Sequence, residues 1–317
     1  MTGRRARDDE IAAWRRDGWV LVDGLIEPDE IDRALPDVHR VFPTGAEYHA
    51  DPAGVTARYL GTPAPAPRDR WPATGPGFRP EQHRWRSQFP FPGDALNRLC
   101  VHPAIVDFME RTLDAGDIRL YQAQIGAKYT GDANYEQPMH TDRNHSWLPP
   151  HPDLRWSHVE SFLYLSDVTD GNAPTHLVPL ERTRHYPPTL PLLWPENEAD
   201  AYAAEIAAPG PRGSLLAYRS DVFHRGVDLT EPNGARFLLN VSFKHAAHDW
   251  IGFTAIQSRA TSYHFIRFVE QSTPRELDLL GFPQPGHPIW TDELLDRTAE
   301  RYPSLDLTPW REAVSGR

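Results

Sequence analysis

Two side chains of types that bind metal ions stand two residues apart, at His140 and Asp142. They follow a strand-like run, and alternate side chains of an extended strand point to the same face, so both are expected to project together. An imidazole and a carboxylate on one face, joined by a second imidazole from elsewhere, form a 2-His-1-carboxylate triad, which leaves positions open on Fe(II) for a cosubstrate and O₂. His224 is the candidate third ligand.

The same spacing recurs at His151 and Asp153, and in a chain with 15 histidines one accidental match is expected. Prolines surround this second pair, and because proline cannot donate to a sheet ladder, the segment is predicted to be a loop. We therefore favour His140 and Asp142. On spacing alone a structural pair explains them as well as a ligand pair, so their partners decide the interpretation.

His224 and Arg236 are the partners in question. His224 follows the strand-like run Gly213–Tyr218, although a turn histidine is the better explanation when it is taken alone. Arg236 opens the next strand-like run, and a guanidinium inside a barrel is costly unless it meets a carboxylate, such as the far end of 2-oxoglutarate. Strand alternation places further residues on the face of Arg236, namely Leu238, Asn240 and Ser242.

The composition limits the possible function classes. A net charge of -11 and a pI near 5.7 argue against nucleic acid or an anionic membrane as a partner, because either would require a broad basic surface. Cys100 is the only cysteine, so the chain has neither an intrachain disulfide nor a cysteine-based zinc site. No apolar run follows the charged N-terminal residues and no 18-residue apolar stretch occurs, so we expect a cytoplasmic protein.

The elements that must position these residues follow from the hydrophobic pattern. Helices are expected at residues 8–17 and after Pro28, the latter with a kink or break at Pro36. Two short helices are expected at about 96–113, the second starting near Pro103. The proline-rich segment 43–93 is expected to be ordered but irregular. Four strand-like runs separated by turns predict an antiparallel sandwich or barrel. These runs are Ile118–Tyr129, His158–Val168, Gly213–Tyr218 and Arg236–Phe243. Helical patterns return at Pro274–Leu280 and Thr291–Tyr302.

We therefore expect one domain over residues 1–317. It comprises a helical N-terminal part with an irregular segment (1–116), a β core (about 117–246) and a helical C-terminal extension (247–317).

The order of these parts resembles the phytanoyl-CoA dioxygenase family of Fe(II)- and 2-oxoglutarate-dependent oxygenases. The resemblance spans about residues 8–245 and is carried by several stretches: Trp14–Val20, Met139–Asp142, Phe162–Val168, Asn172–Pro179 and Gly213–Leu216, followed by His224 and Arg236. It implies a mainly β fold with flanking helices around a double-stranded β-helix (jelly-roll, cupin-like) core. It also implies His140, Asp142 and His224 as iron ligands and Arg236 as the partner of the distal carboxylate of 2-oxoglutarate.

The resemblance further implies an enzyme that uses Fe(II), 2-oxoglutarate and O₂ to hydroxylate or otherwise oxidise an unactivated C–H bond, releasing succinate and CO₂. Asp142 is intact, whereas related halogenases have a small residue there, which favours hydroxylation or a similar oxidation. A departure is Leu180–Arg182, where the family usually has Gly-Ser-His. Gln122, Gln124 and Asn240 are candidate cosubstrate contacts, although ordinary sheet-face residues explain the two glutamines better.

Residues 143–157 follow Asp142 directly and are expected to form a loop over the metal. Arg143, Trp147 and Trp156 of this loop, with Trp85, are candidate substrate contacts, which favours a small molecule with an apolar body and a polar handle. Packing alone would also explain any single tryptophan. Other histidines near the site are expected to be loop or surface residues, namely His145, His151, His158, His245 and His248.

Two other function classes compete with an oxygenase. One is a jelly-roll binding or scaffold protein whose triad holds Zn²⁺ or nothing, and the other is a metal-dependent hydrolase. Neither needs a guanidinium beside open metal positions, so Arg236 is the residue that separates the three hypotheses.

Overall fold

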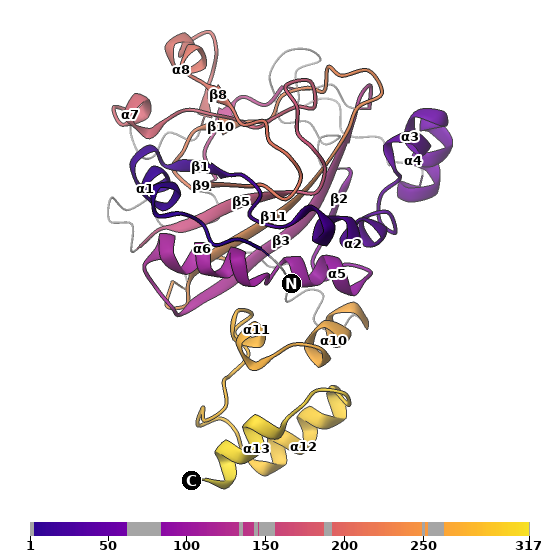
Figure 1. Cartoon of the computed structure of the whole chain (residues 1–317), viewed down its shortest axis with the longest axis vertical. Helices are drawn as coiled ribbons and strands as arrows, with labels where there is room; N and C mark the ends of the chain where they lie inside the picture. Colours follow the sequence, from indigo (N-terminus) through magenta and orange to yellow (C-terminus); the bar gives the residue numbers. More distant parts are fainter. Residues whose placement is uncertain are drawn as a thin grey trace.

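The computed structural model describes residues 3–61, 84–132, 136–142, 145, 156–186, 192–248, 251–252 and 263–316. A β core occupies its upper part, with helices beneath one sheet and the C-terminal helices extending away from the core (Figure 1). None of the described helices is both long enough and apolar enough to cross a membrane.

Two antiparallel sheets form the core. The large sheet has the order β1 (Trp19–Val22), β9 (Leu215–Arg219), β5 (His158–Tyr164), β11 (Ala235–His245), β3 (Ile118–Tyr129) and β2 (Arg86–Gln88). The small sheet has the order β7 (Leu192–Leu193), β4 (Met139–His140), β10 (His224–Arg225), β6 (His176–Leu177) and β8 (Ile206–Ala207). The prediction of a mainly β fold with flanking helices is confirmed.

Helices cover the face of the large sheet that is turned away from the small one (Figure 1). They are α1 (Asp8–Asp17), α2 (Pro28–Val38), α5 (Asp94–Leu99) and α6 (Pro103–Leu113). Gly18 ends α1 with a φ of 83°, and its amide donates to Trp14 O at 2.9 Å. The helices and the sheet share one buried apolar cluster, to which Trp14 and Phe243 contribute fully buried rings.

The remaining helices are α3 (Gly45–Ala50), α4 (Pro52–Leu60), α7 (Leu180–Thr183), α8 (Ala199–Ala203), α10 (Tyr263–Glu270), α11 (Pro274–Asp278), α12 (Asp292–Arg301) and α13 (Thr308–Ser315). In the C-terminal extension, Trp290 and Trp310 pack around Phe282, and both indoles donate to Pro283 O. These aromatic rings belong to the same buried apolar cluster as the helices and the large sheet. The assignment of the whole chain to a single domain stays a prediction.

Two details differ from the expectation. Helix α2 is not broken at Pro36, because this proline lies in the last turn and removes a single helical hydrogen bond. The segment 43–93 is not wholly irregular, since it contains α3, α4 and β2. Thr44 and Glu47 form a capping box at the start of α3, and Asp51 caps α4. These caps are local sequence signals, so both helices were predictable.

Candidate metal centre

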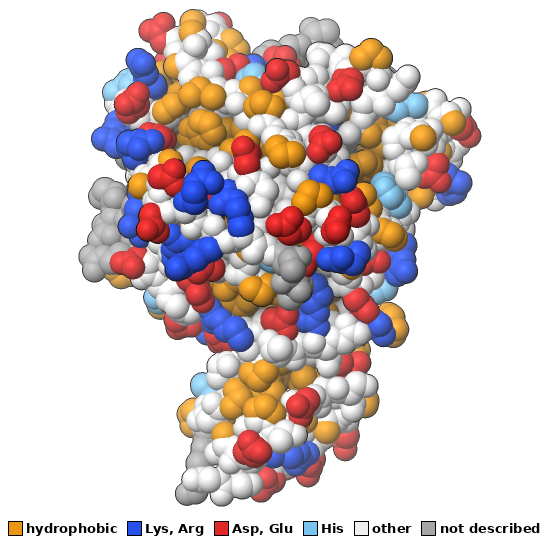
Figure 2. All heavy atoms as spheres, in the orientation of Figure 1, with side chains coloured by type: hydrophobic (Ala, Val, Ile, Leu, Met, Phe, Trp, Pro, Cys, Tyr) orange, Lys and Arg blue, Asp and Glu red, His pale blue; other side chains and the backbone are white. Residues whose placement is uncertain are grey.

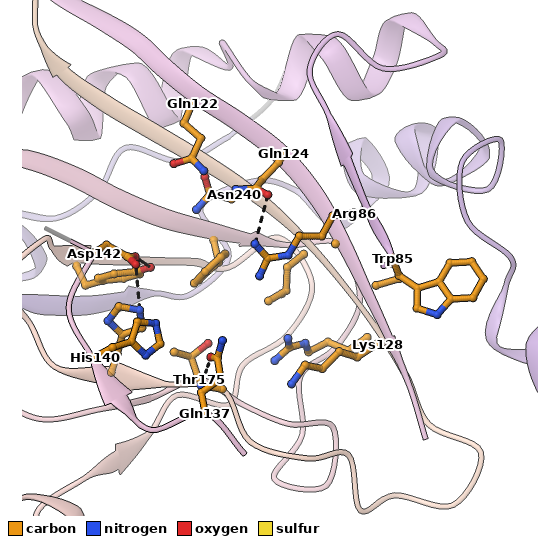
Figure 3. A pocket seen from close by; sticks show the side chains of 18 of the residues that line it. Trp85, Arg86, Gln122, Gln124, Lys128, Gln137, His140, Asp142, Thr175 and Asn240 are labelled. Atoms are coloured by element: carbon orange, nitrogen blue, oxygen red, sulfur yellow. Dashed lines mark hydrogen bonds and ion pairs between the residues drawn. The ribbon is translucent and has the colours of Figure 1, made fainter. Parts of the chain in front are cut away.

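The small sheet brings the two candidate imidazoles together. His140 on β4 and His224 on β10 are directly opposed antiparallel partners, and their ring centroids lie 4.4 Å apart. Asp142 follows β4 by two residues, and one ligand atom from each of the three side chains lies within 4.8 Å of the others. The structure therefore places His140, Asp142 and His224 in one cluster (Figure 3).

Backbone carbonyls fix the orientation of both imidazoles. His140 Nδ1 lies 2.9 Å from Pro138 O, and His224 Nδ1 lies 3.1 Å from Val222 O. A nitrogen facing a carbonyl carries the proton, so Nε2 of each ring keeps its lone pair for a metal ion. Burial, with a further contribution from His224, lowers the pKa of His140 to about 4, so its imidazole is neutral at pH 7.

Asp142 is held in its ionised form. Burial alone would raise its pKa, but the neighbouring His224 and other histidines hold the pKa of Asp142 below its usual value. The hydroxyl of Tyr218 donates to Asp142 Oδ2 at 2.8 Å, and His224 Nε2 lies 3.5 Å from the same oxygen. Two imidazoles and one carboxylate form the donor set expected for non-haem Fe(II), so these residues fit an iron ion.

A cavity between the two sheets opens beside these three side chains. Its described lining includes the predicted cosubstrate residues Arg236, Gln122, Gln124 and Asn240, together with Phe162, Thr175 and Leu238. In Figure 3, His140 and Asp142 occupy one end, Gln122 and Asn240 lie along the large-sheet side, and Lys128 and Arg86 lie toward the opposite end. The cavity thus has a metal-binding end and a basic end.

Arg236 and Lys128 are cross-strand partners at the basic end. Arg236 is 9% exposed and donates to Ala173 O, so its guanidinium is tied to the loop before β6. Lys128 Nζ donates to Val227 O at 2.9 Å. Burial, and then the charge of Arg236, lower the pKa of Lys128 well below its usual value. The guanidinium of Arg236 stays protonated in proteins, so it supplies a permanent positive charge at this end of the cavity.

The structure describes only two of the four candidate substrate residues, Trp85 and Trp156. Arg143 and Trp147 lie outside the described residues. Trp156 is 44% exposed, packs against His248 with ring centroids 5.4 Å apart, and is not among the described residues that line the cavity. The expectation that it walls the cavity is therefore not met.

Trp85 borders the cavity, but its indole points away from the interior (Figure 3). The ring packs among aromatic side chains, including Tyr48 and Tyr129, and its Nε1 donates to Asp132 at 2.9 Å. Trp85 is thus a core residue, and its predicted role as a substrate wall is not supported.

The expectation that the other histidines near the site are loop or surface residues was partly wrong. His158 and His248 are 2% exposed, and His145 lines the cavity. His158 and Glu160 project from β5 with the same two-residue spacing as His140 and Asp142, a signal that was available in the sequence.

An ion network outside the cavity holds the short strand that carries His224. Arg225 donates from Nε and Nη2 to both oxygens of Glu205, at 2.7 and 2.8 Å, and from Nη1 to Glu136 at 3.0 Å. His176 of the neighbouring strand β6 lies 3.0 Å from Glu205 through Nδ1. Since β6 and β10 contain two residues each, we infer that this network fixes their register.

Stability should therefore depend on Glu205 in a pH-dependent manner. Burial alone would raise its pKa, but Arg225 and His176 lower the pKa of Glu205 to about 2 from an ordinary value near 4.5. The stabilisation is then full above pH 4.5 and is lost as the pH falls toward 2. Glu205→Gln should lower the free energy of unfolding at pH 7 by about 3 kcal/mol, measured by chemical unfolding. The difference in unfolding free energy between the variant and the wild type should shrink as the pH falls from 4.5 to 2. Glu196→Gln, at an exposed position, is the control. A cost that is constant with pH would contradict this role.

Tyr218→Phe should weaken Fe(II) binding by about 10- to 100-fold, because the phenol that orients the Asp142 carboxylate is lost while the ring remains. Tyr164→Phe is a matched control, since it removes a buried hydroxyl that donates to Ala208 O, outside the cavity lining. Metal affinity is measured by competition with a chelator. Equal affinities in the two variants would contradict the orienting role of Tyr218.

Comparisons with known proteins agree with this geometry. The family model described as phytanoyl-CoA dioxygenase (PhyH) matches residues 14–230. No curated protein matches the sequence significantly. Among solved structures, the chain is similar to the epimerase SnoN in complex with Fe³⁺, alpha ketoglutarate and nogalamycin RO. The two are 15% identical, with a TM-score of 0.51 over 75% of this chain and 83% of SnoN.

Two further structures are similar to the same degree. One is SnoK, a non-heme alpha ketoglutarate dependent carbocyclase from nogalamycin biosynthesis, at 16% identity and a TM-score of 0.53 over 80% of this chain and 90% of SnoK. The other is EctD from S. alaskensis, at 17% identity and a TM-score of 0.52 over 80% and 83%. Similarities at such low sequence identity show a shared fold and nothing more. They confirm the predicted double-stranded β-helix core.

Proposed function

The chain belongs to the phytanoyl-CoA dioxygenase family, and we propose that it is an Fe(II)- and 2-oxoglutarate-dependent dioxygenase that oxidises an unactivated C–H bond of a small molecule. One observation supports this above all. The cluster of His140, Asp142 and His224 and the guanidinium of Arg236 lie on the same cavity. 2-Oxoglutarate has a metal-chelating keto acid at one end and a carboxylate at the other, so its two ends match this arrangement.

The protein's part at the metal end is to hold the ion rigidly. His140 and His224 present Nε2 because carbonyl oxygens face their Nδ1 atoms, and Tyr218 orients the carboxylate of Asp142. When bound, Fe(II) with 2-oxoglutarate and O₂ supplies the oxidising power for C–H cleavage, with release of succinate and CO₂.

At the basic end, the protein orients the cosubstrate. Arg236 can hold the distal carboxylate through a charge-assisted pair, whose strength is increased by burial. Gln122, 2% exposed, has an Oε1 atom without a hydrogen-bond partner among the described residues. A polar atom left unpaired inside a cavity is expected where a ligand or an ordered water completes the site. Gln122, Gln124 and Asn240 are therefore proposed as cavity residues that contact the cosubstrate or the substrate.

A small molecule with a polar handle suits the described lining. Phe162 and Leu238 offer apolar contacts, whereas most of the other described lining side chains are polar or charged. The indole of Trp85 points away from the cavity and Trp156 does not line it, so among the described residues the larger apolar contacts for a substrate come from Phe162 and Leu238. Two sheets enclose the cavity, which favours positioning of the reacting bond and exclusion of water.

Anaerobic addition of Fe(II) and 2-oxoglutarate tests the proposal. We expect the weak visible charge-transfer band of an iron-bound keto acid, and on admission of O₂ slow formation of succinate. Zn²⁺ in place of Fe(II) is the control, because its filled d shell gives no such band. A well-folded protein that binds Fe(II) but shows neither the band nor succinate would favour the scaffold hypothesis.

A further inference from the structure

A second group of metal-binding side chains lies next to the first. One ligand atom each from His145, His158 and Glu160 lies within 4.8 Å of the others. His145 follows Asp142 by three residues, and its amide donates to Asp142 O at 3.1 Å. We propose that these three residues form a second metal site, for a divalent cation of the Zn²⁺ type, with the hydroxyl of Tyr121 as the fourth ligand. This inference does not depend on the proposed oxygenase activity.

Strand geometry supplies three of the four donors. His158 and Glu160 are two residues apart on β5, so both side chains leave the same face of the large sheet. Tyr121 stands on β3, and β11 lies between β3 and β5 in that sheet. Two imidazoles with a carboxylate and a phenol oxygen form a nitrogen and oxygen donor set that suits Zn²⁺ in four-coordinate geometry.

The crowding at Glu160 is the observation that favours a metal over a dry hydrogen-bond network. Three groups face the single oxygen Oε1: the Tyr121 hydroxyl, His145 Nδ1 at 2.9 Å and His158 Nε2 at 3.3 Å. A carboxylate oxygen has two lone pairs and cannot accept three such bonds well. Accordingly, His158 Nε2 makes no hydrogen bond of good geometry among the described residues, although His158 is 2% exposed.

The surroundings fit a structural site. Ser242 donates to the other oxygen, Oε2, and so orients Glu160 from behind. Tyr121 Oη lies 3.3 Å from His145 Nδ1, so the fourth donor already belongs to the cluster. His145 also lines the cavity, which gives an ion a path of entry. A metal here would tie His145, and with it the backbone of Asp142, to β5.

Titration of metal-free protein with Co²⁺, without 2-oxoglutarate, tests the site. Four-coordinate Co²⁺ absorbs visible light far more strongly than six-coordinate Co²⁺, so the two sites give different spectra. We expect two bound equivalents and one intense band. In His224→Ala the total should fall to one equivalent with the intense band kept. In His158→Gln the intense band should vanish, while one equivalent of bound Co²⁺ remains.

Two further variants guard against misfolding of His158→Gln. His145→Gln changes a less buried ligand and should likewise lose the intense band, while His185→Gln, at an exposed histidine outside both clusters, should keep both equivalents. Zn²⁺ should raise the melting temperature of the wild type and of His224→Ala, but not of His145→Gln. Binding of Co²⁺ to the wild type without an intense band, or an intense band that survives both His145→Gln and His158→Gln, would show that the cluster is a dry hydrogen-bond network.

Discussion

Replacing His140, Asp142 or His224 by alanine is expected to abolish succinate formation while the protein stays folded. Each variant removes one of three ligands, and the remaining two cannot hold Fe(II) in the arrangement that leaves positions open for cosubstrate and O₂. The three side chains lie at the cavity rather than in the apolar clusters, so the loss should fall on metal binding and not on packing. Succinate formation and Fe(II) content are the two measurements.

Thermal unfolding of the metal-free variants shows whether the fold is kept. His185→Ala, at an exposed histidine, should retain full activity and full iron content. Two of the three ligand variants retaining near wild-type turnover of 2-oxoglutarate would show that the ligand assignment is wrong. If all three lose iron but also unfold, the side chains are structural, and the scaffold hypothesis gains support.

The metal cluster was predictable because it follows from short-range geometry. Alternation along one strand places His140 and Asp142 together, and a histidine after a neighbouring strand can reach them. The structure adds what spacing could not give, namely the direct pairing of His140 with His224 across a small sheet of two-residue strands. Strands so short have no hydrophobic alternation to detect, so the small sheet itself was not predicted.

The direction of large side chains was not predictable, since it depends on partners from remote segments. Trp85 directly precedes Arg86, which lines the cavity. Its indole nevertheless packs against Tyr48 of α3 and donates to Asp132 after β3. The second cluster was missed for a related reason. His158 and Glu160 show the ligand spacing, but their burial, and the approach of His145, appear only when the strands are assembled.

Arg236→Leu is expected to raise the KM for 2-oxoglutarate by roughly 30-fold or more. Removing one partner of a buried, charge-assisted pair costs about 2 to 5 kcal/mol, and 1.4 kcal/mol corresponds to a tenfold change. Arg236→Lys should recover part of the loss, because an ammonium restores the charge but not the two-pronged geometry. The fold should hold, since leucine suits a position two residues from Leu238 on the same strand face, and its neighbour Lys128 is relieved of a repelling positive charge.

Anaerobic titration with 2-oxoglutarate, monitored by the charge-transfer band, measures the affinity for 2-oxoglutarate. No turnover occurs without O₂, so the titration separates affinity from catalysis. Arg86→Leu is the informative comparison, because Arg86 is a second cation on the same cavity, on β2, where it donates to Gln124 at 3.4 Å. We expect its effect on 2-oxoglutarate to be smaller than that of Arg236→Leu. A larger effect of Arg86→Leu would show that Arg86, and not Arg236, binds the distal carboxylate. An unchanged KM for 2-oxoglutarate in both variants would place the cosubstrate elsewhere and remove the main support for the proposed reaction.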